Sequence, residues 1–220
     1  MMPKSIFKIQ DYLTLSTKQV CKQFPMKPHS AIICGQTECG KTVFVLDLIE
    51  KVYRDYFEHI VFICPTIRNN KTYLERNWIW SDENVFVIDS DRVQDWLSYL
   101  YPLFSATETL YIIDDCASSQ DINIKKQMLS KLAFSGRHSQ QSIWILTQSY
   151  NAVVTDVRRN TKWVALFHCK DRDSFEYCLQ ENDVIHDRDE VKQVKKQLHD
   201  IKHAKLLLFT EQPSCYKIIR

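Results

Sequence analysis

Glycine is scarce in this chain, which has only three glycines in 220 residues, whereas average usage of about 7% would give about fifteen. Two of the three, Gly35 and Gly40, fall within one short stretch. Glycine is needed where the backbone approaches a ligand closely or takes φ angles that other residues avoid. The scarcity therefore directs attention to this stretch as a candidate binding loop.

Other absences exclude whole classes of protein. No apolar run approaches the ~20 residues of a membrane span, and no N-terminal stretch has the form of a secretory signal, so we expect an intracellular protein without a membrane span. The eight cysteines include no C-x-x-C pair, which favours reduced core thiols over disulfides or zinc ligands. The formal net charge of +2 neither supports nor excludes a nucleic-acid partner, so any basic surface must be local.

Strand and helix patterns alternate from Ser30 onward, which predicts an α/β fold with a mostly parallel sheet and helices on both faces. We expect one domain over residues 30–220, and residues 1–29 as a leading segment or an arm that contacts a neighbouring subunit. The last two predicted strands form an antiparallel hairpin, and residues 170–220 carry no recognisable motif. The predicted strands are 5–9, 30–34, 59–64, 85–88, 110–113, 142–146, 163–167, 205–209 and 214–219; the predicted helices are 43–53, 93–103, 122–134, 172–179 and 189–203.

The glycine-containing stretch fits G-x-x-x-x-G-K-[ST], the Walker A phosphate-binding loop, and lies between a predicted strand and a predicted helix as that motif requires. Backbone N–H groups of such a loop form a nest for phosphates, and the helix N-terminus adds its positive end. Lys41 is expected between the β- and γ-phosphates of ATP, and the Thr42 hydroxyl at a Mg²⁺ position. An ordinary strand-to-helix turn is the alternative. The expected nucleotide-binding residues are Gly35, Gln36, Thr37, Glu38, Cys39, Gly40, Lys41 and Thr42.

A second acidic element has the form of a Walker B strand: the apolar run 110–113 ends in Asp114 and Asp115. Ligands of parallel sheets bind at the carboxyl edge, so these acids are expected to meet the phosphates there. Asp114 is the predicted Mg²⁺ ligand, directly or through water. Asp115 is the predicted group that orients or deprotonates the attacking water. A solvated acidic turn is the alternative.

Further polar residues are candidates for catalysis. Gln148 follows the next predicted strand and is expected to contact the γ-phosphate or the attacking water; a polar strand cap is the alternative. Arg137, Arg158 and Arg159 are candidates for an arginine finger that acts on a neighbouring subunit's γ-phosphate. They are also candidates for contacts with DNA phosphates, or simply solvated surface arginines.

Together, the motifs resemble those of the packaging ATPases of large double-stranded DNA viruses and their transposon-like relatives in the FtsK–HerA superfamily, including the poxvirus-type enzymes and those of virophages and Polinton elements. The resemblance implies a RecA-like P-loop core, a homo-oligomeric ring (pentamer or hexamer) around double-stranded DNA, and ATP-driven packaging of viral DNA into a preformed shell. It also implies a capsid or portal-vertex partner and a location at the virus assembly site, in the host cytoplasm or on the virion. Asp115 stands where cellular members usually carry glutamate. The motifs are GQTECGKT at 35–42, LYIIDD at 110–115, SGRHS at 135–139, ILTQSY at 145–150 and VRRN at 157–160.

Two other functions also fit a P-loop chain of this length. A small nucleotide or nucleoside kinase is one, although its chemistry does not need adjacent acids on one strand followed by a polar strand tip. A nucleotide-gated capsid-assembly protein that hydrolyses ATP slowly is the other. If the chain translocates DNA, it must hold the DNA backbone through lysine and arginine side chains. The solvated face of an amphipathic helix is the alternative for the lysines at 192–205, and the one that we favour. The candidates for DNA contact are Arg68, Lys71, Lys192, Lys195, Lys196, Lys202 and Lys205.

Overall fold

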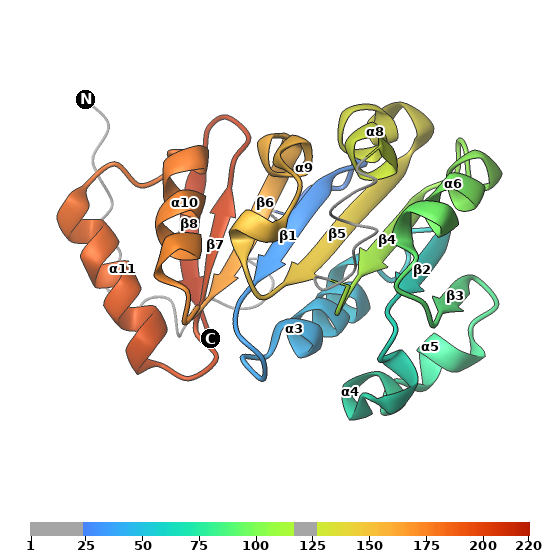
Figure 1. Cartoon of the computed structure of the whole chain (residues 1–220), viewed down its shortest axis with the longest axis horizontal. Helices are drawn as coiled ribbons and strands as arrows, with labels where there is room; N and C mark the ends of the chain where they lie inside the picture. The colour runs from blue at the N-terminus through green and yellow to red at the C-terminus, as the bar shows by residue number, and fades with distance from the viewer. Residues whose placement is uncertain (1–23, 117–126) are drawn as a thin grey trace.

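One eight-stranded sheet, with the order β3-β2-β4-β5-β1-β6-β7-β8, runs through the computed structural model of the chain (Figure 1), which describes residues 24–116 and 127–220. The predicted strand 5–9, nearly all of the leading segment 1–29 and the first part of the predicted helix 122–134 lie outside the described residues. The strands are β1 (Ser30–Cys34), β2 (His59–Ile63), β3 (Val85–Ile88), β4 (Thr109–Ile113), β5 (Gln141–Thr147), β6 (Thr161–Phe167), β7 (Lys205–Phe209) and β8 (Cys215–Ile219).

The sheet is parallel from β3 to β6 and antiparallel at its C-terminal end. Strands β1, β2, β4 and β5 are each parallel to both of their neighbours. Strand β3 is therefore parallel to β2, and β6 is parallel to β1. Strand β7 pairs antiparallel with β6, and β8 pairs antiparallel with β7. The prediction of a mostly parallel sheet ending in an antiparallel hairpin is confirmed.

Helices cover both faces of the sheet, because the crossovers between parallel strands must pass over its faces. Neighbouring strand residues point to opposite faces, so Ile32 belongs to one buried apolar cluster and Ile33 to the other. Helices α6, α8, α9, α10 and α11 contribute to the first cluster, and α3, α4 and α5 to the second, on the opposite face (Figure 1). The helices are α3 (Lys41–Leu48), α4 (Lys71–Leu74), α5 (Asn77–Ser81), α6 (Val93–Leu103), α8 (Gln127–Ser135), α9 (Thr155–Asn160), α10 (Arg172–Asn182) and α11 (Arg188–Asp200).

The helix after the phosphate loop differs from its prediction. It starts as α3 and continues as a π-helical segment, η1 (Ile49–Tyr53). The spacing of Phe44, Leu48 and Val52 in the sequence predicts one apolar face along a regular α-helix. A π-turn holds more residues than the 3.6 of an α-helix, so that face does not continue along the whole helix. The most deeply buried side chains include Val45, Leu46 and Tyr53, whereas the predicted Phe44 and Val52 are only partly buried.

The topology brings the ends of the central strands to one edge. The register pairs Cys34 of β1 with Thr147 of β5, and Ile113 of β4 with Ile145 of β5. The residues that follow β1, β4 and β5 therefore emerge side by side at the carboxyl edge, where ligands of parallel sheets bind. None of the described helices combines the length and the apolar composition that a membrane span requires.

Candidate functional site

The phosphate loop is anchored at its start by the two strands that flank β1. The Gly35 N–H donates to the Thr147 carbonyl oxygen at 3.1 Å, and the Gln36 N–H donates to the His168 carbonyl oxygen at 3.3 Å. A Cβ atom at Gly35 would lie 2.6 Å from Phe167 Cβ and 2.7 Å from Cys39 Sγ. Only glycine fits this position without displacing the loop, which explains one of the three glycines of the chain.

The second half of the loop turns through the left-handed backbone region. Gly40 has φ 99° and Glu38 has φ 62°, and Gly40 directly precedes the first residue of α3. The His203 Nδ1 atom lies 3.0 Å from the Cys39 carbonyl oxygen, so the turn before β7 supports the loop from the C-terminal part of the chain. No sequence motif marked His203, because its role follows from the sheet topology.

Lys41 lies at the mouth of the loop, at the first position of α3. Its Nζ atom donates to the carbonyl oxygens of Gly35 at 2.7 Å and Gln36 at 3.0 Å. The ammonium group therefore bridges the carbonyl oxygens of the first two residues of the loop, which leads into the N-terminus of α3. This arrangement concentrates positive charge where an anion such as a phosphate can bind.

Thr42, Asp114 and Tyr73 form a hydrogen-bonded group that joins three elements. The Thr42 hydroxyl donates to Asp114 Oδ2 at 3.2 Å, and the Tyr73 hydroxyl donates to the same oxygen at 2.6 Å. The other oxygen, Asp114 Oδ1, accepts from the Asp115 N–H at 3.0 Å. The structure thus brings the two sequence-predicted Mg²⁺ ligands together, and adds a tyrosine from α4 that the sequence did not indicate.

Burial dominates the electrostatics of Asp114, which is 3% exposed. Removal from water raises the pKa of its carboxyl group, against the opposing effect of the Tyr73 hydrogen bond. A divalent cation would favour the charged form, and hydroxyl and carboxylate oxygens are ligands that Mg²⁺ accepts. No group of three or more His, Cys, Asp and Glu side chains among the described residues is arranged to hold a metal. Thr42 and Asp114 fit a cation that takes its other ligands from phosphate and water, as Mg²⁺ usually does.

Asp115 is exposed at the same edge of the sheet, and its carboxylate accepts a hydrogen bond from another side chain. The Thr66 hydroxyl, beyond the end of β2, donates to Asp115 Oδ2 at 2.6 Å. Asp115 has φ 55°, a left-handed conformation in which aspartate is more common than most residues. No sequence motif marks Thr66, so its contact with Asp115 appears only in the folded chain.

Gln148 follows β5, which lies between the strands that carry the phosphate loop and Asp114. Its side chain is exposed, one residue beyond the buried Thr147. The Ser149 hydroxyl, next along the chain, lies 3.1 Å from the Ser174 hydroxyl and donates to Asp171 Oδ2 at 3.3 Å. These contacts with the start of α10 fix the turn that presents Gln148 at the edge.

The three candidate arginines are not placed beside the phosphate loop. Arg137 is exposed and lines a small cavity of about 110 Å³ at the amino ends of β1, β5 and β6, the opposite edge of the sheet. Asn160 lines the same cavity, and the exposed Arg159 directly precedes it. The Arg158 guanidinium instead lies 3.3 Å from Glu181 Oε1 of α10, and the side chain is 12% exposed. Arg158 is thus engaged within its own subunit.

Most candidate DNA-binding residues are exposed, but Lys205 is not. Lys205 is 6% exposed, with its Nζ atom 5.2 Å from the ring centre of Phe44 and 5.4 Å from that of Phe167. Burial lowers its pKa to about 8. The expectation that Lys205 contacts DNA is wrong, because the side chain points into the core and away from solvent. The exposed Arg68 lies 3.6 Å from Asp89 in an ion pair.

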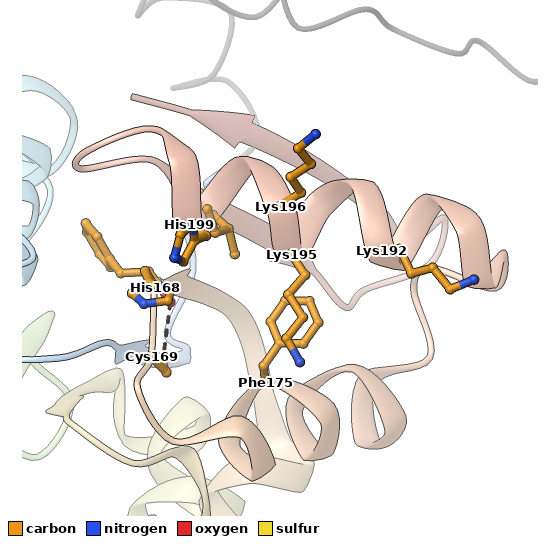
Figure 2. A pocket seen from close by; sticks show the side chains of 9 residues that line it. His168, Cys169, Phe175, Lys192, Lys195, Lys196 and His199 are labelled. Atoms are coloured by element: carbon orange, nitrogen blue, oxygen red, sulfur yellow. Dashed lines mark hydrogen bonds between the residues drawn. The ribbon is translucent and has the colours of Figure 1, made fainter.

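A basic cavity of about 410 Å³ lies beside the end of β6, between α10 and α11 (Figure 2). Its apolar lining comes from Phe167, Phe175 and Leu198. The remaining lining residues are three lysines, two histidines and one cysteine: His168, Cys169, Lys192, Lys195, Lys196 and His199. Two of these lysines are in ion pairs, Lys192 with Asp189 and Lys195 with Glu176. The α11 lysines are thus partly neutralised.

Several solved structures share this fold. B204, the DNA-packaging ATPase of Sulfolobus turreted icosahedral virus, has a TM-score of 0.65 at 12% identity, over 89% of this chain and 98% of that chain. B204 of Sulfolobus turreted icosahedral virus 2, in complex with ATP-gammaS, has a TM-score of 0.62 at 11% identity, over 88% and 97%. The KaiC-like protein PH0186 of Pyrococcus horikoshii OT3 has a TM-score of 0.54 at 15% identity, over 89% and 84%. At these identities the similarity establishes the fold.

Sequence comparison supplies the family. No curated protein sequence matches the chain. The sequence model of one protein family, described as Poxvirus A32 protein, matches residues 18–212, which is most of the chain. That match includes every motif on which the resemblance to poxvirus-type packaging ATPases was based. The chain therefore belongs to the Poxvirus A32 protein family.

Proposed function

We propose that this protein is an ATP-hydrolysing motor that moves double-stranded viral DNA into a preformed capsid. The observation that carries the proposal is the meeting of the phosphate loop with the acidic strand end, where the Thr42 hydroxyl lies 3.2 Å from the Asp114 carboxylate. This is the arrangement that a Mg²⁺–ATP site requires. Membership of the Poxvirus A32 protein family and the shared fold of the genome-packaging NTPase B204 support the same function.

The roles of the residues follow from their positions. Backbone N–H groups of the loop and the start of α3 bind the phosphates, and Lys41 exchanges its bonds to the Gly35 and Gln36 carbonyl oxygens for phosphate oxygens. Mg²⁺, when bound, neutralises charge that develops on the phosphates. Thr42 and Asp114 hold it, directly or through water. The other residues of the loop, Thr37, Glu38 and Cys39, shape the nest.

Two exposed side chains at the same edge act on the attacking water in this proposal. Asp115, held by Thr66 at 2.6 Å, accepts the proton of the water or orients it. Gln148, at the end of the strand between β1 and β4, contacts the γ-phosphate or the water. Both act from the carboxyl edge of the sheet, and the register of β1, β5 and β4 supports this assignment.

Hydrolysis in a ring is completed by an arginine from the neighbouring subunit. Arg137 and Arg159 are exposed at the amino edge, where they cannot reach the phosphate loop of their own subunit but are free to face that of a neighbour. Arg158 is the weaker candidate, because its guanidinium pairs with Glu181 inside its own subunit. An arginine finger stabilises the charge of the transition state, so this arrangement links turnover to ring assembly.

We also propose how the motor contacts DNA and the capsid, and where it acts. The exposed lysines and arginines of the loop after β2 and of α11 contact the DNA backbone without reading its sequence. The motor docks on the capsid or its portal vertex, at the site of virus assembly in the host cytoplasm or on the virion. B204 complexes contain ATP-gammaS, AMPPCP and AMP, which supports ATP as the nucleotide of this chain.

The test is ATP turnover by the purified protein with and without long double-stranded DNA. The account predicts turnover that DNA stimulates and that Lys41→Ala abolishes. Lys51→Ala, on the outer side of the same helical segment in an exposed ion pair with Asp47, is the matched control and should retain turnover. Turnover that is indifferent to DNA would contradict the motor and favour a nucleotide-gated capsid-assembly protein. Transfer of the γ-phosphate to a small acceptor would instead indicate a kinase.

A further inference from the structure

Two cysteine thiols meet at the base of the phosphate loop. Cys34 Sγ lies 3.7 Å from Cys169 Sγ, although the two residues are 135 positions apart in the sequence. Cys34 ends β1 and directly precedes Gly35. Cys169 follows His168, whose carbonyl oxygen accepts the Gln36 N–H. The two sulfurs therefore flank the point where the loop is anchored to β6.

The separation of the two sulfurs is close to what a covalent bond requires. A disulfide has an S–S distance of about 2.05 Å, so the sulfurs, now 3.7 Å apart, need to approach by about 1.7 Å. Cys34 is fixed within the central sheet, whereas Cys169 lies in the connection between β6 and α10. Rotation of the Cys169 side chain, with a small shift of this connection, accounts for the approach.

The two thiols differ in access and in acidity. Cys34 is fully buried, whereas Cys169 is partly exposed and lines the 410 Å³ cavity between α10 and α11 (Figure 2). The hydrogen bond from Cys34 lowers the pKa of Cys169, and the charge of Lys41 acts in the same direction. The same contact and burial raise the pKa of Cys34. A small oxidant in the cavity therefore meets the thiol that ionises first, with a resolving thiol directly behind it.

We propose that Cys34 and Cys169 are a reversible oxidation site that forms a disulfide under a peroxide and slows nucleotide turnover. The Cys169 thiolate attacks one oxygen of hydrogen peroxide, which breaks the O–O bond and gives a sulfenic acid and hydroxide, which takes up a proton to form water. The Cys34 sulfur then attacks the sulfenic sulfur, forms the S–S bond and loses its proton as a second water leaves. Two thiols are oxidised and one peroxide is reduced to two waters. A thiol reductant reverses the change.

The effect on turnover, unlike the disulfide itself, rests on the proposed function. Drawing Cys169 toward Cys34 moves the adjacent His168 carbonyl, which holds the Gln36 N–H at 3.3 Å. It also strains the end of β1, next to the Gly35 carbonyl that Lys41 contacts at 2.7 Å. Displacements near 1 Å in such a site are enough to cost about 100-fold in rate. We therefore expect oxidation to slow hydrolysis by about 10-fold or more.

The experiment treats the full-length protein with hydrogen peroxide, blocks free thiols and maps the peptides without reduction. The result expected is a linked pair of peptides that contain Cys34 and Cys169, with turnover that falls about 10-fold or more and returns after dithiothreitol. Cys169→Ser should lose both the link and the reversible inhibition, and Cys34→Ala should lose the link. Cys215→Ser, in the terminal hairpin strand β8, is the matched control and should behave as the unsubstituted protein.

Two outcomes would overturn the proposal: no link between Cys34 and Cys169, or equal reversible inhibition of Cys169→Ser and the unsubstituted protein. The link between the two peptides is detected without measuring ATP hydrolysis. A protein that forms the link but hydrolyses no ATP in its reduced state would support the disulfide and contradict the proposed function. The two claims can therefore fail separately.

Discussion

The hydroxyl oxygen of Thr42 lies 3.2 Å from Oδ2 of Asp114, across 72 positions of sequence. This contact joins the phosphate loop to the end of β4, two strands away in the sheet. The same carboxylate oxygen accepts the Tyr73 hydroxyl at 2.6 Å. The proposed cation site is therefore assembled from three separate crossovers of the fold.

Removal of either proposed cation ligand should abolish Mg²⁺-dependent hydrolysis. We expect Thr42→Ala and Asp114→Asn each to lower turnover by about 100-fold or more, which corresponds to ~2.7 kcal/mol of transition-state stabilisation. The measurement is turnover over a range of Mg²⁺ concentrations. Lys51→Ala is the control, because its side chain is 55% exposed and is a proposed ligand of neither the cation nor the nucleotide. Unchanged Mg²⁺ dependence in Asp114→Asn would contradict the assignment.

Tyr73→Phe should change the pH dependence of hydrolysis. The Tyr73 hydrogen bond opposes the rise in the Asp114 pKa that burial causes, so its removal raises that pKa further. The cation requires ionised Asp114, and the acidic limb of the rate profile should therefore move to higher pH. The ring of Tyr73 stays in place, buried against Phe62 at a centroid distance of 5.7 Å. A rate profile identical to that of the unsubstituted protein would exclude this role.

The three arginines should separate into structural and catalytic groups. Arg158→Ala removes the ion pair with Glu181 and the bond to Thr155 at 3.1 Å, so it should lower the free energy of unfolding by about 1–3 kcal/mol. Arg137→Ala and Arg159→Ala should change stability by no more than about 0.5 kcal/mol.

The rate of ATP hydrolysis should also distinguish the arginine variants. At least one of Arg137→Ala and Arg159→Ala should bind ATP normally yet hydrolyse it about 1,000-fold more slowly. Binding is measured with a fluorescent ATP analogue, and turnover is measured in the assembled ring. Full activity in all three variants would exclude an arginine finger from this set.

His29 should make the fold sensitive to acid. This buried histidine has Nδ1 at 2.8 Å from the Lys27 carbonyl oxygen, and its Nε2 accepts from Trp144 Nε1 at 2.9 Å, which requires the neutral ring. Burial lowers its pKa from 6.5 to about 4, so the unfolded chain takes up the proton first. Its contribution to stability is complete above pH 6.5 and is lost as the pH falls towards 4, by up to ~3 kcal/mol.

Urea unfolding at several pH values between 4 and 7 measures this effect. His29→Gln should flatten the loss of stability within that window, whatever its stability at pH 7. His186→Gln is the matched control, because the His186 side chain is 72% exposed and should leave the pH dependence unchanged. Parallel pH dependence in His29→Gln and the unsubstituted protein would show that another group causes the acid sensitivity.

The sequence was most informative where local patterns determine the structure. Apolar strands, the phosphate loop and the acidic end of β4 are short-range features, and the rule that parallel strands bind ligands at their carboxyl edge places them together. The C-terminal hairpin followed in the same way, from two apolar runs on either side of a turn. The apolar spacing of Val191, Val194, Leu198 and Ile201 predicts one buried helix face, and Val194 and Leu198 of α11 are indeed buried.

Features that depend on distant partners were not predictable. Tyr73, Thr66 and His203 reach the site through the packing of crossovers, and their local sequences carry no periodicity or motif. Lys205 was misjudged because its charge suggested solvent, whereas its strand position buries it between two aromatic rings. The π-helical end of the first helix also escaped prediction, since apolar periodicity assumes 3.6 residues per turn.

The central claim is that hydrolysis drives movement along double-stranded DNA. The most direct test places the assembled protein on a long duplex that carries a labelled third strand at one end, and measures ATP-dependent displacement of that strand. The account predicts displacement with ATP, after a delay that grows with duplex length, and none with Lys41→Ala or without ATP. ATP hydrolysis that DNA stimulates but that never displaces the third strand would contradict a translocating motor.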